Sequence, residues 1–551
     1  MKKSLVIALA ILTATACGNR NKCPQYVYDV PQYENGIAQT RTAQGLVEGY
    51  KQGPLYIFRG IRYAVAERFM PPVEPESWEG VRHFRSPGPM SPQGFGFGGS
   101  SVRPAPAETN DITYDTRQKS QSEDCLRLNI WTQGLDDGGK RPVMVWLHGG
   151  AFQASCGDLE ICYDGSMLAK KGDVVVISIN HRLNCVGYLD LSSFGEKYRY
   201  SGNVGIMDIV AALKWINANI EHFGGDPNNI TIFGQSGGGG KVSATLAAPS
   251  SKGLVSRAIV ESGVNIDFYN SDLSRLIGEE TVRQLGIPAG EIDRIQTIPY
   301  EELSRAANAA MNIIRKQAPE LGMKVNEFGW APTVDGNFLP WTVAEALKRG
   351  VSADVPLMIG TTLNELVTVS PANRGMSMEA AREAVIKKYG AEIADEYIDT
   401  YSCCYPGFEP RDLIETDYYF RANAVREASL KAEYGKAPVY RYELNYLSPA
   451  QDSLFRCPHN MEIAFAFNNV HLSPAFAGFT EDSRRLNDII SDVWISFARD
   501  GKPYSKQLPE WPAFKPEEGA TMIFNNKCEV RYNHDKELVS LMKDYTANPY
   551  F

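Results

Sequence analysis

The chain has 551 residues, 43% of them hydrophobic and 22% charged, and its formal net charge at pH 7 is −9. This balance is typical of a globular protein that buries a large core. The acidic charge, and the lack of a basic stripe with interleaved aromatic residues, argue against a nucleic-acid partner. No Pro/Ser-rich linker, repeat or low-complexity run marks a point of division.

The N-terminal segment is typical of an export signal. Lys2 and Lys3 precede the apolar run LVIALAIL, and small residues then lead to Cys17. The run is too short for a stable membrane span, so we expect residues 1–16 to be a signal peptide outside the fold. Two interpretations remain open: ordinary cleavage just before Cys17, or a lipoprotein signal in which Cys17 carries a lipid. The second is favoured, although Ala14 stands where leucine is usual. Both predict an exported protein that is periplasmic, outer-membrane-anchored or extracellular.

The middle of the chain alternates between strand and helix patterns. A buried strand that ends in glycines is predicted within 141–152, another is predicted over 173–180, and apolar residues recur at helical spacing over 203–223. A third strand over 229–233 leads into a glycine-rich turn, after which helical spacing resumes over 241–249. This order predicts an α/β protein with a central, mostly parallel sheet and helices on both faces.

Ser236 lies between the third strand and the helix that follows it, in the stretch GQSGGGG. A nucleophile that protrudes at the end of a strand requires a tight, strained turn. Gly234 and Gly238 lack the Cβ atoms that would collide across such a turn. The helix N-terminus offers free N–H groups and a partial positive charge to a developing oxyanion. A phosphate-binding loop is the alternative, but the stretch lacks the Gly-Lys-Ser/Thr ending of such loops.

A serine nucleophile requires a histidine base, and His459 is the candidate that remains by elimination. In the α/β-hydrolase arrangement the chain order is serine, acid, histidine, so four of the seven histidines come too early. His459 lies in a loop just before an alternating apolar run. His471 lies beyond that run, and His534 lies in a charged stretch near the C-terminus.

The acid that orients the histidine should follow another strand. Residues 355–360 predict a buried strand, and Glu365 lies in the polar loop after it. Asp335 is the competing candidate, but the series Val-Asp-Gly-Asn around it is typical of a turn. Glu365 is therefore the predicted acid.

With these residues in place, the chain resembles the type-B carboxylesterases, the family that includes bacterial p-nitrobenzyl esterases and the cholinesterases. The resemblance rests on segments in the family's order that span nearly the whole mature chain: SEDCLRLNIW (122–131), VWLHGGAF (145–152), FGGDPNNITIFGQSGGG (223–239), the loop of Glu365 and the segment of His459.

The resemblance implies an α/β-hydrolase fold with long inserted helical and loop segments, and a single catalytic domain over residues 17–551. It implies hydrolysis of carboxylic esters by a triad of Ser236, Glu365 and His459 through an acyl-enzyme. It also implies an oxyanion hole made by three backbone N–H groups, those of Gly150, Ala151 and Gly237. No cofactor or metal is required.

The sequence departs from the family pattern at several positions. Relatives often carry Glu before the serine and Ala after it, where this chain has Gln235 and Gly237. Ser91 stands where relatives carry a cysteine that pairs with the counterpart of Cys125, so we expect Cys125 to be a buried free thiol. Among the other cysteines, the pair at 156 and 162 could close a short loop by a disulfide.

The substrate is the least determined part of the prediction. A thioesterase, an amidase or a deacetylase of decorated carbohydrate would share every residue named above. A non-catalytic binding module on the same fold is a second class of function. The acyl and alcohol pockets are expected along residues 265–339 and 376–437, with Phe152, Phe328 and Trp330 as candidate wall residues. The sequence does not determine the oligomeric state.

Overall fold

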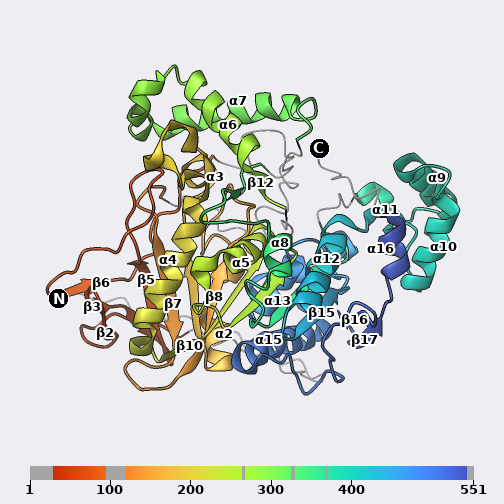
Figure 1. Cartoon of the computed structure of the whole chain (residues 1–551). Coiled ribbons are helices and arrows are strands. Elements are labelled where there is room, and N and C mark those ends of the chain that lie inside the picture. Colours follow the sequence, from red (N-terminus) through yellow and green to blue (C-terminus); the bar gives the residue numbers. More distant parts are fainter. Residues whose placement is uncertain (1–28, 95–119, 264–266, 324–328, 366–369, 543–551) are drawn as a thin grey trace, which may run out of the picture.

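The computed structural model describes residues 29–94, 120–263, 267–323, 329–365 and 370–542. The largest sheet formed by these residues has 12 strands (Figure 1). In spatial order its strands are β1 (Pro31–Gln32), β4 (Tyr50–Gln52), β5 (Leu55–Arg62), β7 (Arg127–Thr132), β9 (Val175–Ile179), β8 (Arg141–Leu147), β10 (Gly225–Gln235), β11 (Arg257–Glu261), β14 (Leu357–Thr362), β15 (Val439–Leu444), β16 (Ala520–Phe524) and β17 (Glu529–Tyr532). A small three-stranded sheet contains β2 (Gln39–Thr42), β3 (Gly45–Glu48) and β6 (Val81–His83). A two-stranded sheet contains β12 (Tyr269–Asn270) and β13 (Thr333–Val334).

The helices of the described ranges cover both faces of the large sheet or lie in the segments that leave it. They are α2 (Ser166–Gly172), α3 (Asn184–Tyr188), α4 (Val204–Asn219), α5 (Gly237–Ala247), α6 (Ser271–Gln284), α7 (Tyr300–Gln317), α8 (Val343–Lys348), α9 (Met378–Tyr389), α10 (Ala394–Cys404), α11 (Asp412–Glu415), α12 (Tyr419–Tyr434), α13 (Met461–Ala466), α14 (Pro474–Ala477), α15 (Glu481–Asp500) and α16 (Lys536–Met542).

The centre of the sheet is parallel, and its two ends are antiparallel. All neighbouring pairs from β9 through β8, β10, β11, β14 and β15 to β16 are parallel. The pairs β1–β4, β4–β5, β5–β7 and β7–β9, and β16–β17 at the other edge, are antiparallel. The predicted α/β-hydrolase fold with a mostly parallel sheet is confirmed. The long insertions lie between β11 and β14, where α6 and α7 form, and between β14 and β15, where α9 to α12 form (Figure 1).

Each face of the sheet carries its own hydrophobic core, because side chains alternate along a strand. On β8, Val143, Val145 and Leu147 belong to a core cluster that contains the buried residues of α4 and α5. Met144 and Trp146 of the same strand belong to a second cluster with the buried residues of α15. A fully buried side chain of this size contributes about 1.5–3 kcal/mol. The site at the strand ends therefore rests on a sheet that is packed on both faces.

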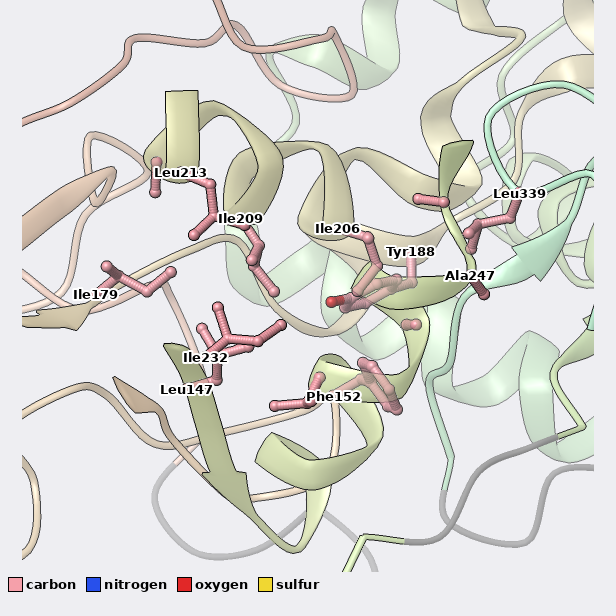
Figure 2. Close-up of a cluster of buried hydrophobic side chains, with 14 of the residues drawn as sticks. Leu147, Phe152, Ile179, Tyr188, Ile206, Ile209, Leu213, Ile232, Ala247 and Leu339 are labelled. Atoms are coloured by element: carbon pink, nitrogen blue, oxygen red, sulfur yellow. The ribbon is translucent and has the colours of Figure 1, made fainter. Parts of the chain in front are cut away.

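Part of the first cluster surrounds the end of β8 that leads to the site. Figure 2 shows Ile209 of α4 pointing toward Ile232 of β10, with Leu147 beside it. Phe152, which follows β8, belongs to the same cluster, and its ring packs edge-on against that of Tyr188 at 5.3 Å between centroids. The chain segment after β8 is thus anchored in the core.

The predicted central elements are present, with shifted ends. The strand predicted over 229–233 is the core of β10, and the strand predicted over 355–360 is β14, which begins at Leu357. The helix predicted over 203–223 is α4 followed by a 3₁₀ turn, Ile220–Phe223, which ends at Gly224 in the left-handed region (φ 71°). The run after His459 alternates like a strand but folds as the short helix α13. Within the described ranges, no helix has both the length and the apolar character needed to cross a bilayer.

The cysteines of the described ranges confirm one prediction and correct another. Cys125 is a fully buried free thiol, as expected from Ser91 in place of a cysteine, and burial raises its pKa to about 12. The short disulfide considered between Cys156 and Cys162 is not formed. Cys162 is a free thiol whose Sγ donates to a carboxylate oxygen of Glu160 at 3.6 Å.

Glu427 of α12 is a buried carboxyl that should make stability depend on pH. It accepts a hydrogen bond from Ser243 Oγ at 2.6 Å, and burial raises its pKa to about 7. The folded state therefore holds this proton more tightly than the unfolded chain, where a glutamate titrates near pH ~4.3. The stabilising contribution is present at low pH and is lost as the pH rises through about 7.

We expect Glu427→Gln to gain stability relative to the unmodified protein as the pH rises from 5 to 8, by about 2 kcal/mol. Urea unfolding at the two pH values measures this difference. A stability difference between variant and parent that is the same at pH 5 and pH 8 would contradict the buried titration.

Candidate functional site

Ser236 lies at the sharp turn between β10, which ends at Gln235, and α5, which begins at Gly237. Its backbone has φ 60° and ψ −126°, a conformation that costs a residue with a Cβ of order 1–3 kcal/mol. The turn is held by a hydrogen bond from Ser236 N to Glu261 O at 2.8 Å and by one from Gly240 N to Ser236 O at 3.0 Å. The side chain is partly exposed. The strained strand–turn–helix predicted from the sequence is therefore present.

Two glycines make this turn sterically feasible. A Cβ added to Gly234 would lie 2.5 Å from Leu147 O and 2.7 Å from the carbonyl carbon of Gly238. A Cβ on Gly238 would overlap with Leu147 O as well. The predicted close approach across the turn is confirmed for Gly234, which meets Gly238, whereas Gly238 is constrained by the end of β8 instead.

The loop after β8 lies directly against the start of α5. Gly150 and Ala151 both have positive φ, 81° and 52°, so the loop curls back after the strand. A Cβ added to Gly237 would overlap with the Cα and the carbonyl group of Ala151. Within the described part of the chain, the N–H groups of these three residues donate to no carbonyl or side chain. Three N–H groups free to bind an anion therefore come from two segments in contact, beside the serine.

Although relatives often carry Ala at this position, in this chain the new methyl group of Gly237→Ala must push the backbone of Ala151 away, so we expect kcat to fall by about 10- to 100-fold with little change in KM. Steady-state hydrolysis of a p-nitrophenyl ester measures both constants. Gly290→Ala is the matched control, since a Cβ at Gly290 meets nothing within 4 Å. Equal kcat for the two variants would contradict the close fit of the loop against α5.

Glu365 follows β14 and is held through both of its carboxylate oxygens. The residue is 2% exposed. Its Oε1 accepts a hydrogen bond from Thr362 N at 2.8 Å, and its own N–H donates to Thr362 Oγ1 at 3.2 Å. Its Oε2 is hydrogen-bonded to Nδ1 of His459. The predicted acid thus has a fixed orientation toward the predicted base.

Backbone hydrogen bonds join the loop of the acid to the loop of the histidine. His459 N donates to Glu365 O at 3.1 Å, and Asn364 N donates to Cys457 O at 3.0 Å. The side-chain oxygen of Asn364 accepts from Cys457 N at 3.0 Å. His459 Nδ1 faces the carboxylate, while its Nε2 is buried and has no partner within the described residues. The Nε2 atom of the imidazole therefore remains available for a hydrogen bond.

Gln235 ties the serine turn to the histidine loop. Its Nε2 donates to the carbonyl oxygen of His459 at 2.5 Å, although 224 positions separate the two residues. The structure thus brings the segments of Ser236, Glu365 and His459 together. A direct hydrogen bond from Ser236 Oγ to His459 Nε2 is not formed in this state.

Other buried groups surround the imidazole. The ring of Phe420 lies 4.7 Å from that of His459 between centroids, and Phe420 N donates to Asp417 Oδ2 at 2.8 Å. Burial, with the nearby charge of Glu365, raises the pKa of Asp417 to about 7. Burial also raises the pKa of Glu160 to about 7, and this carboxyl interacts electrostatically with His459.

The competing candidates from the sequence have other roles. Asp335 holds a turn, accepting hydrogen bonds from Asn337 N at 2.8 Å and Leu339 N at 3.0 Å through the same oxygen. His534 pairs with Glu443 at 3.1 Å. These contacts leave Glu365 as the carboxyl that bonds to His459.

Two of the three candidate residues for the wall of the substrate pocket lie in the described part of the chain. Phe152 and Trp330 are 0% and 3% exposed and belong to the first core cluster, and Trp330 Nε1 donates to Asn308 Oδ1 at 3.3 Å. Phe328 lies outside the described residues. A role for any of the three in substrate binding stays a prediction.

One cluster in the described ranges has the residue types and spacing of a metal site: Glu443, His534 and Asp535. Arginines already compensate both carboxylates, Arg421 at 3.2 Å from Glu443 and Arg441 at 2.9 Å from Asp535. Although burial opposes it, the charge of Arg421 lowers the pKa of Glu443 to about 2. The cluster is a buried ion network that joins strands and helices, and the donors do not fit a cation.

Two residues that hold the site, Thr362 and Lys241, were not predicted from the sequence, and Gln235 stood out there only as a departure from the family pattern. Thr362 fixes Glu365, Gln235 binds the His459 loop, and Lys241 of α5 lies fully buried behind the loop of Gly150. Of Thr362 and Lys241, only the lysine leaves a signal in the sequence, as a single charge on a helix face composed otherwise of small and apolar residues.

Comparison with known proteins agrees with this geometry. Residues 36–541 match the model of the carboxylesterase family. The para-nitrobenzyl esterase of Bacillus subtilis is 33% identical over 90% of this chain and 96% of its own length, and human cocaine esterase is 32% identical over 88% and 86%. A solved esterase from Clostridium hathewayi, described as able to hydrolyse aliphatic aromatic polyesters, superposes with a TM-score of 0.83 at 36% identity. The superposition covers 94% of this chain and 100% of the Clostridium hathewayi esterase chain. The chain therefore belongs to the carboxylesterase family and is a carboxylic ester hydrolase.

Proposed function

We propose that the chain hydrolyses esters by two-step acyl transfer, with Ser236 as nucleophile, His459 as general base and Glu365 as the acid that orients it. The observation that carries this proposal is the hydrogen bond from His459 Nδ1 to Glu365 Oε2, with Nε2 left without a partner among the described residues. A neutral imidazole with its proton on Nδ1 has its lone pair on Nε2 and can accept the serine proton there.

The first step acylates the serine. Ser236 Oγ attacks the ester carbonyl while His459 Nε2 takes the hydroxyl proton, and Glu365 stabilises the imidazolium that forms. The oxyanion of the tetrahedral intermediate accepts hydrogen bonds from the N–H groups of Gly150, Ala151 and Gly237. Each well-placed donor of this kind contributes about 10²–10³ in turnover. The imidazolium returns the proton to the leaving alcohol.

The second step frees the enzyme. Water loses a proton to His459 Nε2 as it attacks the acyl carbon, and collapse of the second intermediate releases the carboxylic acid and restores Ser236. A burst of p-nitrophenol close to one equivalent per chain, followed by slower turnover, is the expected kinetic signature. Linear release without a burst, for esters whose acylation is fast, would count against an acyl-enzyme.

The substrate class is proposed as a small carboxylic ester. Support comes from relatives named for p-nitrobenzyl and cocaine esters and from the polyester-hydrolysing neighbour. Rates on p-nitrophenyl esters of increasing acyl length, beside a thioester, an anilide and acetylated or feruloylated sugars, separate the alternatives. Higher kcat/KM on the thioester or anilide than on any ester would move the physiological substrate to that class.

We also propose that the protein is exported and attached to a membrane through a lipid on Cys17. The two lysines, the apolar run and the small residues before Cys17 support this proposal. Cell fractionation and intact mass of the mature protein test it. Release of Cys17→Ala from the membrane fraction is expected, and an unlipidated mature chain in soluble fractions would favour ordinary cleavage instead.

A further inference from the structure

Lys241 is a buried lysine without a carboxylate partner. It lies in the second turn of α5, five positions after Ser236, and is 0% exposed. No carboxylate of the described ranges forms an ion pair with it, and burial lowers its pKa well below the usual value. Removing an amine from water in this way is costly unless its protons are used elsewhere. The contacts it makes should therefore explain its position.

The protons of Lys241 are donated to the loop that follows β8. Its Nζ donates to His148 O at 2.8 Å and to Gly149 O at 3.3 Å. The same Nζ lies 5.8 Å from the centre of the Phe152 ring, on the far side of Gly150 and Ala151 in the sequence. The lysine thus contacts the loop both before and after the two residues whose N–H groups face the oxyanion.

The contact with Gly149 O determines the direction of an oxyanion donor. A peptide unit is planar and trans, so its C=O and its N–H point in opposite directions. The carbonyl of Gly149 and the N–H of Gly150 belong to the same unit. A lysine that holds the carbonyl on one side therefore directs the N–H of Gly150 to the other.

Gly149 itself lies against the serine turn. A Cβ added to Gly149 would lie 3.5 Å from Ser236 Cβ and 3.1 Å from Gln235 O, so Gly149 packs directly on the nucleophile turn. A donor bound to a carbonyl also polarises the amide and strengthens the N–H on its far side. From these contacts we propose that Lys241 is a positioning residue of the oxyanion hole, acting through the carbonyl of Gly149. The inference rests on the proposed acyl-transfer function.

One imidazole next to this site shares the carbonyl of Gly149 with the lysine. The rings of His148 and His181 stack at 4.8 Å, and each Nδ1 bonds to a backbone carbonyl, Gly149 O at 2.9 Å and Arg182 O at 3.2 Å. Burial lowers the pKa of both histidines well below the usual value, so they remain neutral beside Lys241. The bond of His148 stays within the loop, whereas Lys241 of α5 ties the same carbonyl, and that of His148, to the helix that carries the nucleophile.

The test is Lys241→Met, which keeps the length of the side chain and removes its donors. Lys431→Met is the matched control, because Lys431 is also buried, 1% exposed, and also donates to a backbone carbonyl, that of Ser352. Both variants should lose thermal stability. Only Lys241→Met should lower kcat, by about 10- to 100-fold, with KM for p-nitrophenyl butyrate changed less than about threefold.

A trifluoromethyl ketone gives a second readout that a purely structural role would not move. It forms a tetrahedral adduct whose oxyanion needs the same donors, so its inhibition constant should rise by the factor by which kcat/KM falls. Lys241→Gln, which retains a shorter donor, should lose less than Lys241→Met and serves if the methionine variant does not fold.

The outcomes separate this inference from the function on which it rests. If the unmodified protein hydrolyses esters and Lys241→Met matches Lys431→Met in kcat and in ketone affinity, the positioning role is wrong and the esterase proposal stands. If Lys241→Gln and Lys241→Met both fold and both keep the parental kcat, the positioning role is again wrong. If the unmodified protein hydrolyses no ester and forms no ketone adduct, the proposed function itself fails.

Discussion

Ser236→Ala is expected to lower kcat for ester hydrolysis by about 10⁴- to 10⁶-fold, while substrate still binds. The backbone at this position already has φ 60°, and the alanine methyl group fits wherever the serine Cβ fits, so the turn should persist. What disappears is the oxygen that becomes acylated. The residual rate should come from the oxyanion donors and His459 acting on water, without a burst of product.

The control for this variant is Ser243→Ala. Ser243 is on the same helix, and its Oγ donates to the buried carboxyl of Glu427 at 2.6 Å. Its loss should cost stability by about 1–3 kcal/mol and leave kcat within a few-fold. A Ser236→Ala protein that retains more than about a hundredth of the parental kcat, in preparations free of parent enzyme, would remove Ser236 from the mechanism.

Glu365→Gln is expected to lower kcat by about 10³- to 10⁴-fold although the change is nearly isosteric. Oε1 of Glu365 accepts a hydrogen bond from Thr362 N, so the oxygen of a glutamine should take that position. The amide NH₂ would then face His459 Nδ1, which must accept rather than donate. The imidazole proton is thereby forced onto Nε2, where the base needs a lone pair.

Asp335→Asn is the control for the effect expected of Glu365→Gln. The substitution changes the carboxyl that the sequence offered as the competing acid. Its Oδ2 accepts from Asn203 Nδ2 at 2.9 Å, so the amide should cost stability, while kcat should stay within a few-fold. Loss of activity in Asp335→Asn together with retention in Glu365→Gln would reverse the assignment of the acid. A similar drop in melting temperature for both variants would show that stability does not explain the difference.

Much of the site was predictable from the sequence because local chemistry specifies it. The apolar run 229–233 followed by glycines predicted a strand and a sharp turn, and the overlaps of Gly234 and Gly238 with neighbouring backbone are the physical reason for those glycines. Chain order and loop position were enough to select Glu365 and His459. Their hydrogen bond is a long-range contact that agrees with that choice.

The remaining features depend on contacts that a single sequence does not encode. β10 begins at Gly225, four residues before its predicted start. The prediction missed these residues because Gly, Asp, Pro and Asn are typical of turns. The run in α13 alternates over too few residues for its period to distinguish helix from strand. The antiparallel pairing of β5 with β7 depends on which strands lie side by side in the fold, and the pattern within one strand does not specify its neighbour. Likewise, the contacts of Gln235 and Lys241 join distant segments.

The most direct test of the central claim is the position of the covalent adduct. A fluorophosphonate should react with one equivalent per chain, and peptide mass mapping should place the phosphonyl group on Ser236, with labelling abolished in Ser236→Ala and strongly slowed in Glu365→Gln. An active enzyme that carries the adduct on another residue, or that Ser236→Ala labels at the parental rate, would contradict the account.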